Sequence, residues 1–240
     1  MIFKNHSSIW ESIADLMTGL MMVFMFVCVG FLYMLNRDTE NYEQMHEGIY
    51  NKLVEKFPAE KLKEWGAEID KDLSVRFKNS DVLFELDSST VKPGYRMILR
   101  EFFPKFVEVV KEFDEKDDGN NIKEVRIEGH SSPVLGREIS RNNLSYFYNM
   151  KLSQDRARNV LQAIFDIPEM QKAENREWLI KMVTANGLSF SKPPKAKNIT
   201  GAQSGKLNMD DAQRVEFRII PNAEKVAEKR LGGGKKNGAK

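Results

Sequence analysis

The sequence predicts a two-layer α/β protein that follows a single N-terminal transmembrane helix and a helical connector. Three patterns predict it: a long apolar run near the N-terminus, an apolar stripe with helical spacing behind it, and alternating strand-like and helix-like periods beyond residue 73. We therefore expect four segments: residues 1–36 with the transmembrane helix, 37–72 as the connector, 73–221 as the folded domain, and 222–240 as a basic flexible tail.

The composition excludes several classes of function. With 41% hydrophobic and 30% charged residues, the 240-residue chain has the composition of a folded protein. A net charge of +2 without a basic face argues against nucleic-acid binding. The one cysteine, Cys28, can form no intrachain disulfide and no cysteine-rich metal site. Because no paired carboxylates, activated serine or metal cluster occur at suggestive spacing, we expect neither an enzyme nor a bound cofactor.

The apolar run at residues 16–36 is long enough to cross a bilayer. Its 21 residues carry no formal charge, and a rise of about 1.5 Å per residue covers the roughly 30 Å of the hydrocarbon core. It is longer than the apolar core of a signal peptide, and no Ala-x-Ala cleavage pattern follows it. We therefore expect a retained single-pass anchor in lipid. Basic residues on both sides, Lys4 and Arg37, leave the orientation open by the positive-inside rule.

One carboxylate, Asp15, lies inside the apolar zone, because Trp10 and Ile13 extend that zone ahead of it. A carboxylate at membrane depth is costly, and such residues usually face a protein interior, pair with another group or bind an ion. Alternatively, Asp15 caps the helix start among the lipid headgroups. The small residues Thr18 and Gly19 let another helix approach closely. Because one helix cannot enclose an ion path, the ion-binding interpretation implies a polytopic partner subunit.

The segment Ala14-Asp15-Leu16-Met17-Thr18, behind Trp10 and ahead of a Met- and Phe-rich helix, resembles the ion-binding helix of MotB-type stator subunits of the flagellar motor. The resemblance implies that Asp15, with Thr18, binds the translocated proton or sodium ion. It also implies a single-pass protein of the bacterial inner membrane with its C-terminal domain in the periplasm.

The connector carries an apolar stripe at Tyr42, Met45, Ile49, Leu53 and Phe57, and beyond Pro58 at Leu62, Trp65 and Ile69. The spacing of three and four predicts a helix to about residue 57 and a second helical stretch up to residue 72. We expect the stripe to pack in a dimeric coil or on the domain. Relatives among the stators also suggest a plug that blocks ion flow.

Alternation of period defines the elements of the domain. We expect strands at 73–77 and 82–84, a helix from Pro93 through 110, a strand at 122–128, a helix opened by Ser153, a helix at 178–182 leading into a strand near Val183, a polar loop at 189–211 and a last strand at 215–219.

Three motifs in this domain resemble the OmpA-like peptidoglycan-binding domain. They are Gly129-His130-Ser131-Ser132 after a strand, Tyr148-Asn149-Met150-Lys151-Leu152-Ser153-Gln154-Asp155-Arg156-Ala157, and Arg214-Val215-Glu216 in the last strand. The resemblance implies that Arg156 offers a planar fork to a carboxylate of the peptide stem. Asn149 is expected to fix the loop ahead of the helix, and Ser153 to cap that helix.

The other candidate peptidoglycan-binding residues are His130, Ser132 and Arg214. His130 is expected to form structural hydrogen bonds more readily than to bind a metal, because no second histidine or cysteine is suitably spaced. Ser132 stands where the family has a ligand-binding aspartate, and a serine cannot pair with an ammonium group. The ligand of this domain is therefore left open.

Over the whole chain, the short N-terminus, the Asp15 helix and the long loop after His130 resemble the MotB-like subunits of Zorya anti-phage systems. That resemblance implies a homodimer with a polytopic MotA- or ZorA-like partner in five copies, in which ion flow drives rotation that signals to cytosolic effectors. A flagellar MotB-like stator subunit and a passive OmpA-like envelope tether are the alternatives.

Overall fold

The computed structural model of the 240-residue chain describes residues 5–78, 80–85, 87–116, 120–135, 138–139, 142–191 and 212–222. The chain divides into two compact units. The first includes residues 1–44, and the second begins at Met45. Most of the expected loop at 189–211 and nearly all of the expected basic tail at 222–240 lie outside the described residues.

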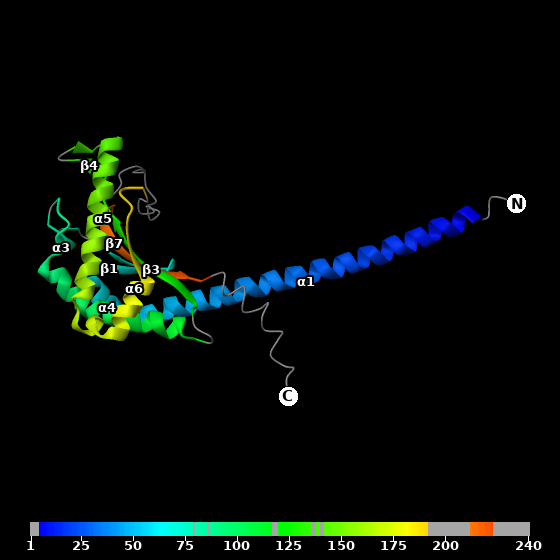
Figure 1. Ribbon diagram of the computed structural model, residues 1–240, viewed down its shortest axis with the longest axis horizontal. Helices are drawn as coiled ribbons and strands as arrows, with labels where there is room; N and C mark the ends of the chain where they lie inside the picture. Colours follow the sequence, from blue (N-terminus) through cyan, green and yellow to red (C-terminus); the bar gives the residue numbers. More distant parts are fainter. Residues whose placement is uncertain are drawn as a thin grey trace, which may run out of the picture. The chain divides into compact units, whose positions relative to one another are not determined.

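The described part of the first unit is the N-terminal part of helix α1 (Asn5–Lys56), blue in Figure 1. Its segment Trp10–Met34 is long and apolar enough to cross a membrane, and the described rest of the chain buries none of it. Leu16 and Met25 lie on opposite faces of the helix and expose 72% and 54% of their surface. Because a helix that is apolar all round needs a nonaqueous environment, this segment fits the predicted transmembrane helix.

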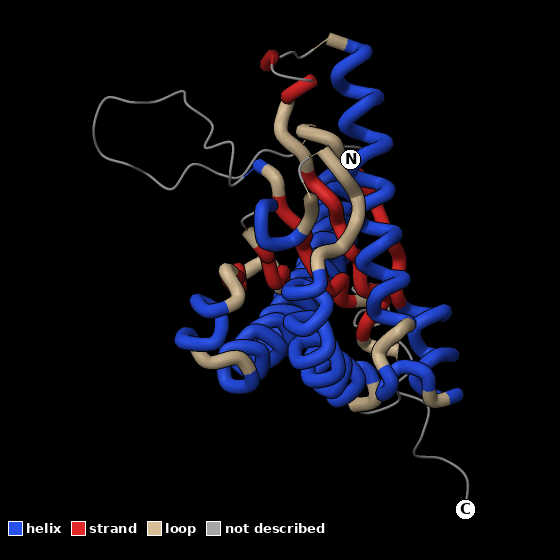
Figure 2. The backbone as a smooth tube through the Cα atoms, turned by 90° about the vertical axis from the view of Figure 1, so that its left-hand side faces the viewer, coloured by secondary structure: helices blue, strands red, loops and turns tan. Residues whose placement is uncertain are grey.

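The second unit is built on a five-stranded sheet with the strand order β1-β2-β7-β3-β6. Neighbouring strands are antiparallel, except that β3 and β6 run parallel, and the long connection between them contains α5, η1 and α6. A separate hairpin is formed by β4 (Val134–Leu135) and β5 (Glu138–Ile139). The sheet strands, red in Figure 2, are β1 (Ala67–Asp70), β2 (Ser74–Phe77), β3 (Ile122–His130), β6 (Val183–Gly187) and β7 (Arg214–Pro221).

Aromatic side chains join the helices to one face of this sheet. The ring of Phe102, on α4 (Pro93–Asp114), lies 5.1 Å from the rings of both Phe77 on β2 and Phe217 on β7, and all three are fully buried. This packing confirms the predicted two-layer α/β class. The remaining helices are α2 (Ala59–Glu64), α3 (Ser80–Leu83), α5 (Asn143–Phe165), η1 (Pro168–Gln171) and α6 (Ala173–Met182).

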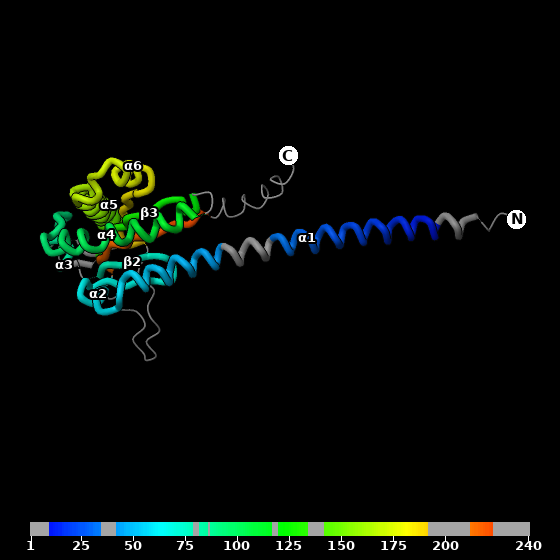
Figure 3. Tube along the Cα trace, turned by 90° about the horizontal axis from the view of Figure 1, so that it is seen from below, coloured from blue at the N-terminus to red at the C-terminus, as the bar shows by residue number. Residues whose placement is uncertain are grey.

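The expected connector at 37–72 contributes directly to the second unit. The end of α1 runs antiparallel to α4 (Figure 3), with Lys56 Nζ 2.6 Å from Glu108 and the ring of Phe57 5.1 Å from Phe102. The apolar stripe of α1 is therefore buried in the domain core, which was one of the two expected packings. The expected helix up to residue 72 is wrong beyond Trp65, because Gly66 adopts a φ of +63° and the chain reverses into β1.

Two other sequence expectations are wrong. The strand expected at 82–84 is the short helix α3, and only Phe84 makes a bridge, with Val91. The helix expected to open at Ser153 begins at Asn143, because the side chain of Asn142 accepts a hydrogen bond from the backbone of Ser145 at 2.8 Å and caps the helix. Such a cap is easily missed in a sequence, because asparagine is equally common in turns.

Candidate functional site

Asp15 and Thr18, the expected ion-binding residues, lie one turn apart on α1. The hydroxyl of Thr18 donates a hydrogen bond to the carbonyl of Ala14 at 2.8 Å, so it is occupied by its own helix. Asp15 is exposed, and within the described part of the chain no hydrogen bond or ion pair engages its carboxylate. The ion-binding role of both residues stays a prediction.

The other candidate site lies on the middle turns of α5, which pack unusually close to the sheet. A Cβ atom on Gly129 of β3 would lie 2.2 Å from the carbonyl oxygen of Ser153, and one on Gly187 of β6 would lie 2.4 Å from the nitrogen of Gln154. The side-chain amide of Gln154 donates a hydrogen bond from Nε2 to the carbonyl of Ala185 at 3.1 Å, and its Oε1 accepts one from the backbone nitrogen of Gly187 at 2.7 Å. These contacts fix the backbone from which Arg156 projects.

Arg156 is 3% exposed and lies well inside α5, not near its start. Its Nε donates to the carbonyl of Ser88 at 2.9 Å, its Nη1 reaches Oε1 of Gln213 at 3.5 Å, and the guanidinium lies 4.8 Å from the centre of the Phe84 ring. Burial lowers the pKa of Arg156, while the charge of Asp87 opposes that shift. Both hydrogen-bond acceptors are neutral, and no carboxylate among the described residues lies within ion-pair distance of this cation.

Ser132 is linked to Arg156 through a residue that the sequence did not indicate. The side chain of Ser132 is 2% exposed, and its hydroxyl accepts a hydrogen bond from Nε2 of Gln213 at 2.9 Å. The other end of the same amide accepts from Arg156. Gln213 precedes the predicted last strand, but nothing in the sequence marks it as the bridge between two distant motifs.

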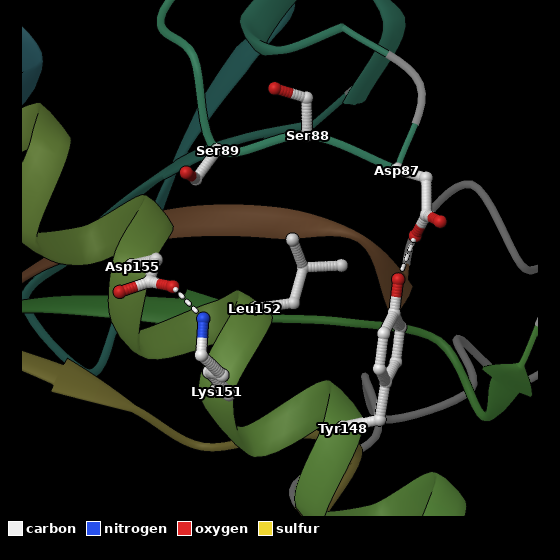
Figure 4. Close-up of a pocket in the computed structure, with 7 residues that line it drawn as sticks. All are labelled: Asp87, Ser88, Ser89, Tyr148, Lys151, Leu152 and Asp155. Atoms are coloured by element: carbon white, nitrogen blue, oxygen red, sulfur yellow. Dashed lines mark hydrogen bonds and ion pairs between the residues drawn. The ribbon is translucent and has the colours of Figure 1, made fainter.

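A pocket of about 300 Å³ opens beside this chain of hydrogen bonds. Leu152 lies between two polar pairs in it (Figure 4). At one end, the Tyr148 hydroxyl donates to Oδ1 of Asp87 at 2.7 Å, and this bond raises the pKa of Tyr148. At the other end, Lys151 Nζ lies 3.1 Å from Asp155. The lining is completed by Ser88 and Ser89.

Asn149 and Ser153 have structural roles that differ from those expected. Asn149 lies inside α5, where its Nδ2 donates to the carbonyl of Ser145 at 3.0 Å, so it fixes no loop ahead of the helix. The carbonyl of Asn149 accepts from the Ser131 hydroxyl at 3.4 Å. Ser153 is not a cap: its hydroxyl accepts from the backbone of Ser189 at 3.0 Å. These groups attach α5 to the turn after β3 and to the chain after β6.

His130 and Arg214 belong to a different cluster, on the face of the sheet away from the aromatic core. The ligand atoms of Glu128, His130 and Glu216 lie within 4.8 Å of one another and are buried, an arrangement that could hold a metal. However, Glu216 accepts from Nε of Arg214 at 2.6 Å and from Nη2 of Arg218 at 2.7 Å. Since arginines already occupy these oxygens, the cluster fits a structural ion network better than a cation site.

The same network explains the state of its titratable groups. Burial lowers the pKa of His130, so the ring is neutral at physiological pH. Burial alone would raise the pKa of Glu216, but the charges of Arg214 and Arg76 and the hydrogen bond from Arg214 lower it, and His130 adds to this effect only when it is protonated. Among the five residues expected to bind peptidoglycan, Arg156 is joined to the pocket by its hydrogen bond to the lining residue Ser88.

Comparison with known proteins finds a relative that matches most of the chain. The Zorya protein ZorB of Escherichia coli strain Crooks is 39% identical over 223 residues, which cover 90% of this chain and 88% of the relative. No protein-family model matches the chain.

Three solved structures show a distant likeness. A MotB-like protein from Desulfovibrio vulgaris is 20% identical with a TM-score of 0.49, over 77% of this chain and 96% of its own. The cell wall anchor of the T6SS from Pseudomonas aeruginosa is 20% identical with a TM-score of 0.43, over 70% and 97%. The periplasmic domain of Helicobacter pylori MotB is 10% identical with a TM-score of 0.38, over 68% and 87%.

Proposed function

The chain belongs to the family of the Zorya protein ZorB, and from that membership we propose that it is the membrane-anchored stator-type subunit of an ion-driven motor complex in anti-phage defence. The observation that carries the proposal is the extent of the match, which spans nine-tenths of the chain. A match of that length must include residues from both the apolar helix and the α/β domain. The proposal therefore concerns the membrane helix and the α/β domain together, and not the α/β domain alone.

In this proposal, Trp10–Met34 crosses the bacterial inner membrane once and the α/β domain lies in the periplasm. The apolar surface of this segment supports it, since the described residues of the same chain cover none of its apolar stretch. Lipid and a partner must then cover it. We assign that role to a polytopic ZorA-like subunit in five copies around a dimer of this chain.

Asp15 carries the translocated ion, a proton, in this proposal. Its carboxylate has no partner within the described residues. Asp15 projects from the helix whose apolar surface no other described part of the chain covers. An unpaired carboxylate at membrane depth is costly and is retained where it serves transport. Thr18, one turn away, lines the same path.

The α/β domain anchors the complex to peptidoglycan. A stator must be held in place, and the pocket combines an apolar lining residue, Leu152, with polar and charged ones. Arg156, a buried cation without a carboxylate partner among the described residues, bonds to the backbone of the lining residue Ser88. Arg214 contributes through the ion network, His130 as the buried neutral ring beside Glu128 and Glu216, and Ser132 and Asn149 through the hydrogen bonds that fix Gln213 and α5.

The test is the substitution Asp15→Asn in cells that also express the polytopic partner. It keeps the size of the side chain and removes the charge, so we expect loss of phage protection at a normal membrane level of the protein. The matched control is Glu11→Gln, which removes a carboxylate one turn earlier and should retain protection. Full protection by Asp15→Asn would contradict the proposal and support a passive tether.

A further inference from the structure

His130 is buried, and neither of its ring nitrogens has a hydrogen-bond partner among the described residues. Its Nε2 lies 3.8 Å from Oε2 of Glu128 and 3.7 Å from Oε1 of Glu216, and both distances are too long for a hydrogen bond. Burial lowers the pKa of His130, whereas the two carboxylates oppose that shift. Uptake of a proton would turn the neutral ring into a cation that attracts both carboxylates.

The oxygen of Glu216 nearest to His130 is already engaged. It accepts from Nε of Arg214 at 2.6 Å and lies 3.1 Å from Nε of Arg76. Because a carboxylate oxygen has about two lone-pair sites, a cationic ring would compete with these arginines for it. The charged groups of the described residues in this cluster are Arg76 of β2, Glu128 of β3, and Arg214, Glu216 and Arg218 of β7.

Arg214 connects this cluster to Gln213, its neighbour in the chain. Besides its bond to Glu216, the Arg214 guanidinium donates from Nη1 to the carbonyl of Ala212 at 3.4 Å. The Arg214 side chain therefore contacts the backbone on the other side of Gln213. A shift of this guanidinium would move the short segment 212–214 that contains Gln213.

Gln213 in turn joins the two motifs expected to bind the wall. Its Nε2 donates to the Ser132 hydroxyl at 2.9 Å, and its Oε1 lies 3.5 Å from Nη1 of Arg156. Ser132 also follows His130 by two residues, so the histidine reaches both ends of this bridge through short paths. A change in charge at His130 is therefore coupled to the position of Arg156.

We propose that His130 is a pH sensor for wall binding. Its protonation draws Glu216 away from Arg214, and the resulting shift of Gln213 weakens the binding of peptidoglycan. This inference rests on the proposed binding of peptidoglycan and adds its regulation. In the proposed motor the α/β domain lies in the periplasm, so the sensor responds to the acidity of that compartment.

The test is co-sedimentation of the full-length chain in detergent with purified Escherichia coli peptidoglycan sacculi at about pH 7.5 and about pH 5.5, on either side of the ordinary histidine pKa. We expect the wild type to bind about fivefold more weakly at the lower pH, the usual effect of losing one hydrogen bond. His130→Gln, which cannot take up a proton, should bind equally at both. The matched control is His46→Gln on α1, which should keep the wild-type difference. Gln213→Ala should bind at the weaker level at both pH values, because the bridge is already lost.

The outcomes separate the sensor from wall binding itself. Binding that is equal at both pH values in the wild type, or an undiminished pH difference in His130→Gln, would overturn the sensor and leave wall binding intact. Absence of wild-type binding at both pH values would overturn the proposed wall anchoring, and the sensor with it. Tryptophan fluorescence shows whether each protein is folded at each pH. If His130→Gln does not fold, Gln213→Ala decides, since a wild-type pH difference in that variant would overturn the path through Gln213.

Discussion

Gly129 faces Ser153 so closely that a Cβ atom at residue 129 would lie 2.2 Å from the Ser153 carbonyl oxygen. The contact sets the distance between β3 and α5, the helix that carries Arg156. Side chains of other residues cannot enter that space without moving the helix.

Gly129→Ala should therefore destabilise the domain by about 3 kcal/mol or more, because the methyl group meets backbone and not a flexible side chain. The measurement is urea unfolding of the full chain in detergent, followed by tryptophan fluorescence. The control is Gly94→Ala, where nothing lies within 4 Å of the added atom. An unfolding free energy within about 0.5 kcal/mol of the wild type, the range of ordinary surface mutations, would contradict the close packing.

Leu53→Ala should also destabilise the domain, although residue 53 lies on the long N-terminal helix. Leu53 is fully buried in the core that contains Phe102, so we expect a loss of about 3 kcal/mol from the lost contacts and the cavity. Val54→Ala is the matched control, because Val54 is 45% exposed. If both variants unfold like the wild type, the end of α1 is an independent connector.

The parts of the fold that depend on local pattern could be predicted from the sequence. Apolar periodicity indicated α4, β3 and β7, and the uncharged run indicated the transmembrane part of α1. The strand β1 was missed because Leu62, Trp65 and Ile69 continue a helical spacing, and only the positive φ of Gly66 breaks it. Pairing with β2, a tertiary effect, then decides the conformation.

The candidate site was predicted only in part. The motif around Arg156 was visible, but its bonds to Ser88 and Gln213 join segments 68 and 57 residues away, which no local pattern reports. Asp87 was not singled out for the same reason, since its partner Tyr148 lies 61 residues further along the chain. Only the structure reveals a cluster of charged residues that the fold brings together from distant parts of the sequence.

Arg156→Lys should weaken binding to native sacculi more than about tenfold, despite keeping the charge. A lysine cannot donate to Ser88 and Gln213 together in one plane, nor cover the Phe84 ring as a guanidinium does. The measurement is co-sedimentation of the full-length chain in detergent with purified Escherichia coli peptidoglycan sacculi. The control is Arg158→Lys, because Arg158 exposes 65% of its side chain. Wild-type affinity in Arg156→Lys would show that the planar group is dispensable.

His130 should make the stability of the domain depend on pH. Burial holds the pKa of His130 in the folded protein below its ordinary value of 6.5, with Glu128 and Glu216 at 3.8 and 3.7 Å and Arg214 nearby. The unfolded chain therefore takes up a proton before the folded one does as the pH falls. The contribution of the neutral histidine to stability is present above about pH 6.5 and is lost progressively as the pH falls toward the lower folded pKa.

We expect the unfolding free energy of the wild type to decrease over this interval and that of His130→Gln to decrease less. Urea titrations of both proteins at a series of pH values between about 7.5 and 5.5 measure the difference, since the other histidines contribute equally to each. Parallel pH profiles would show that His130 is not buried in its neutral form. The network around Glu216 would then include a histidine cation in addition to its three arginines.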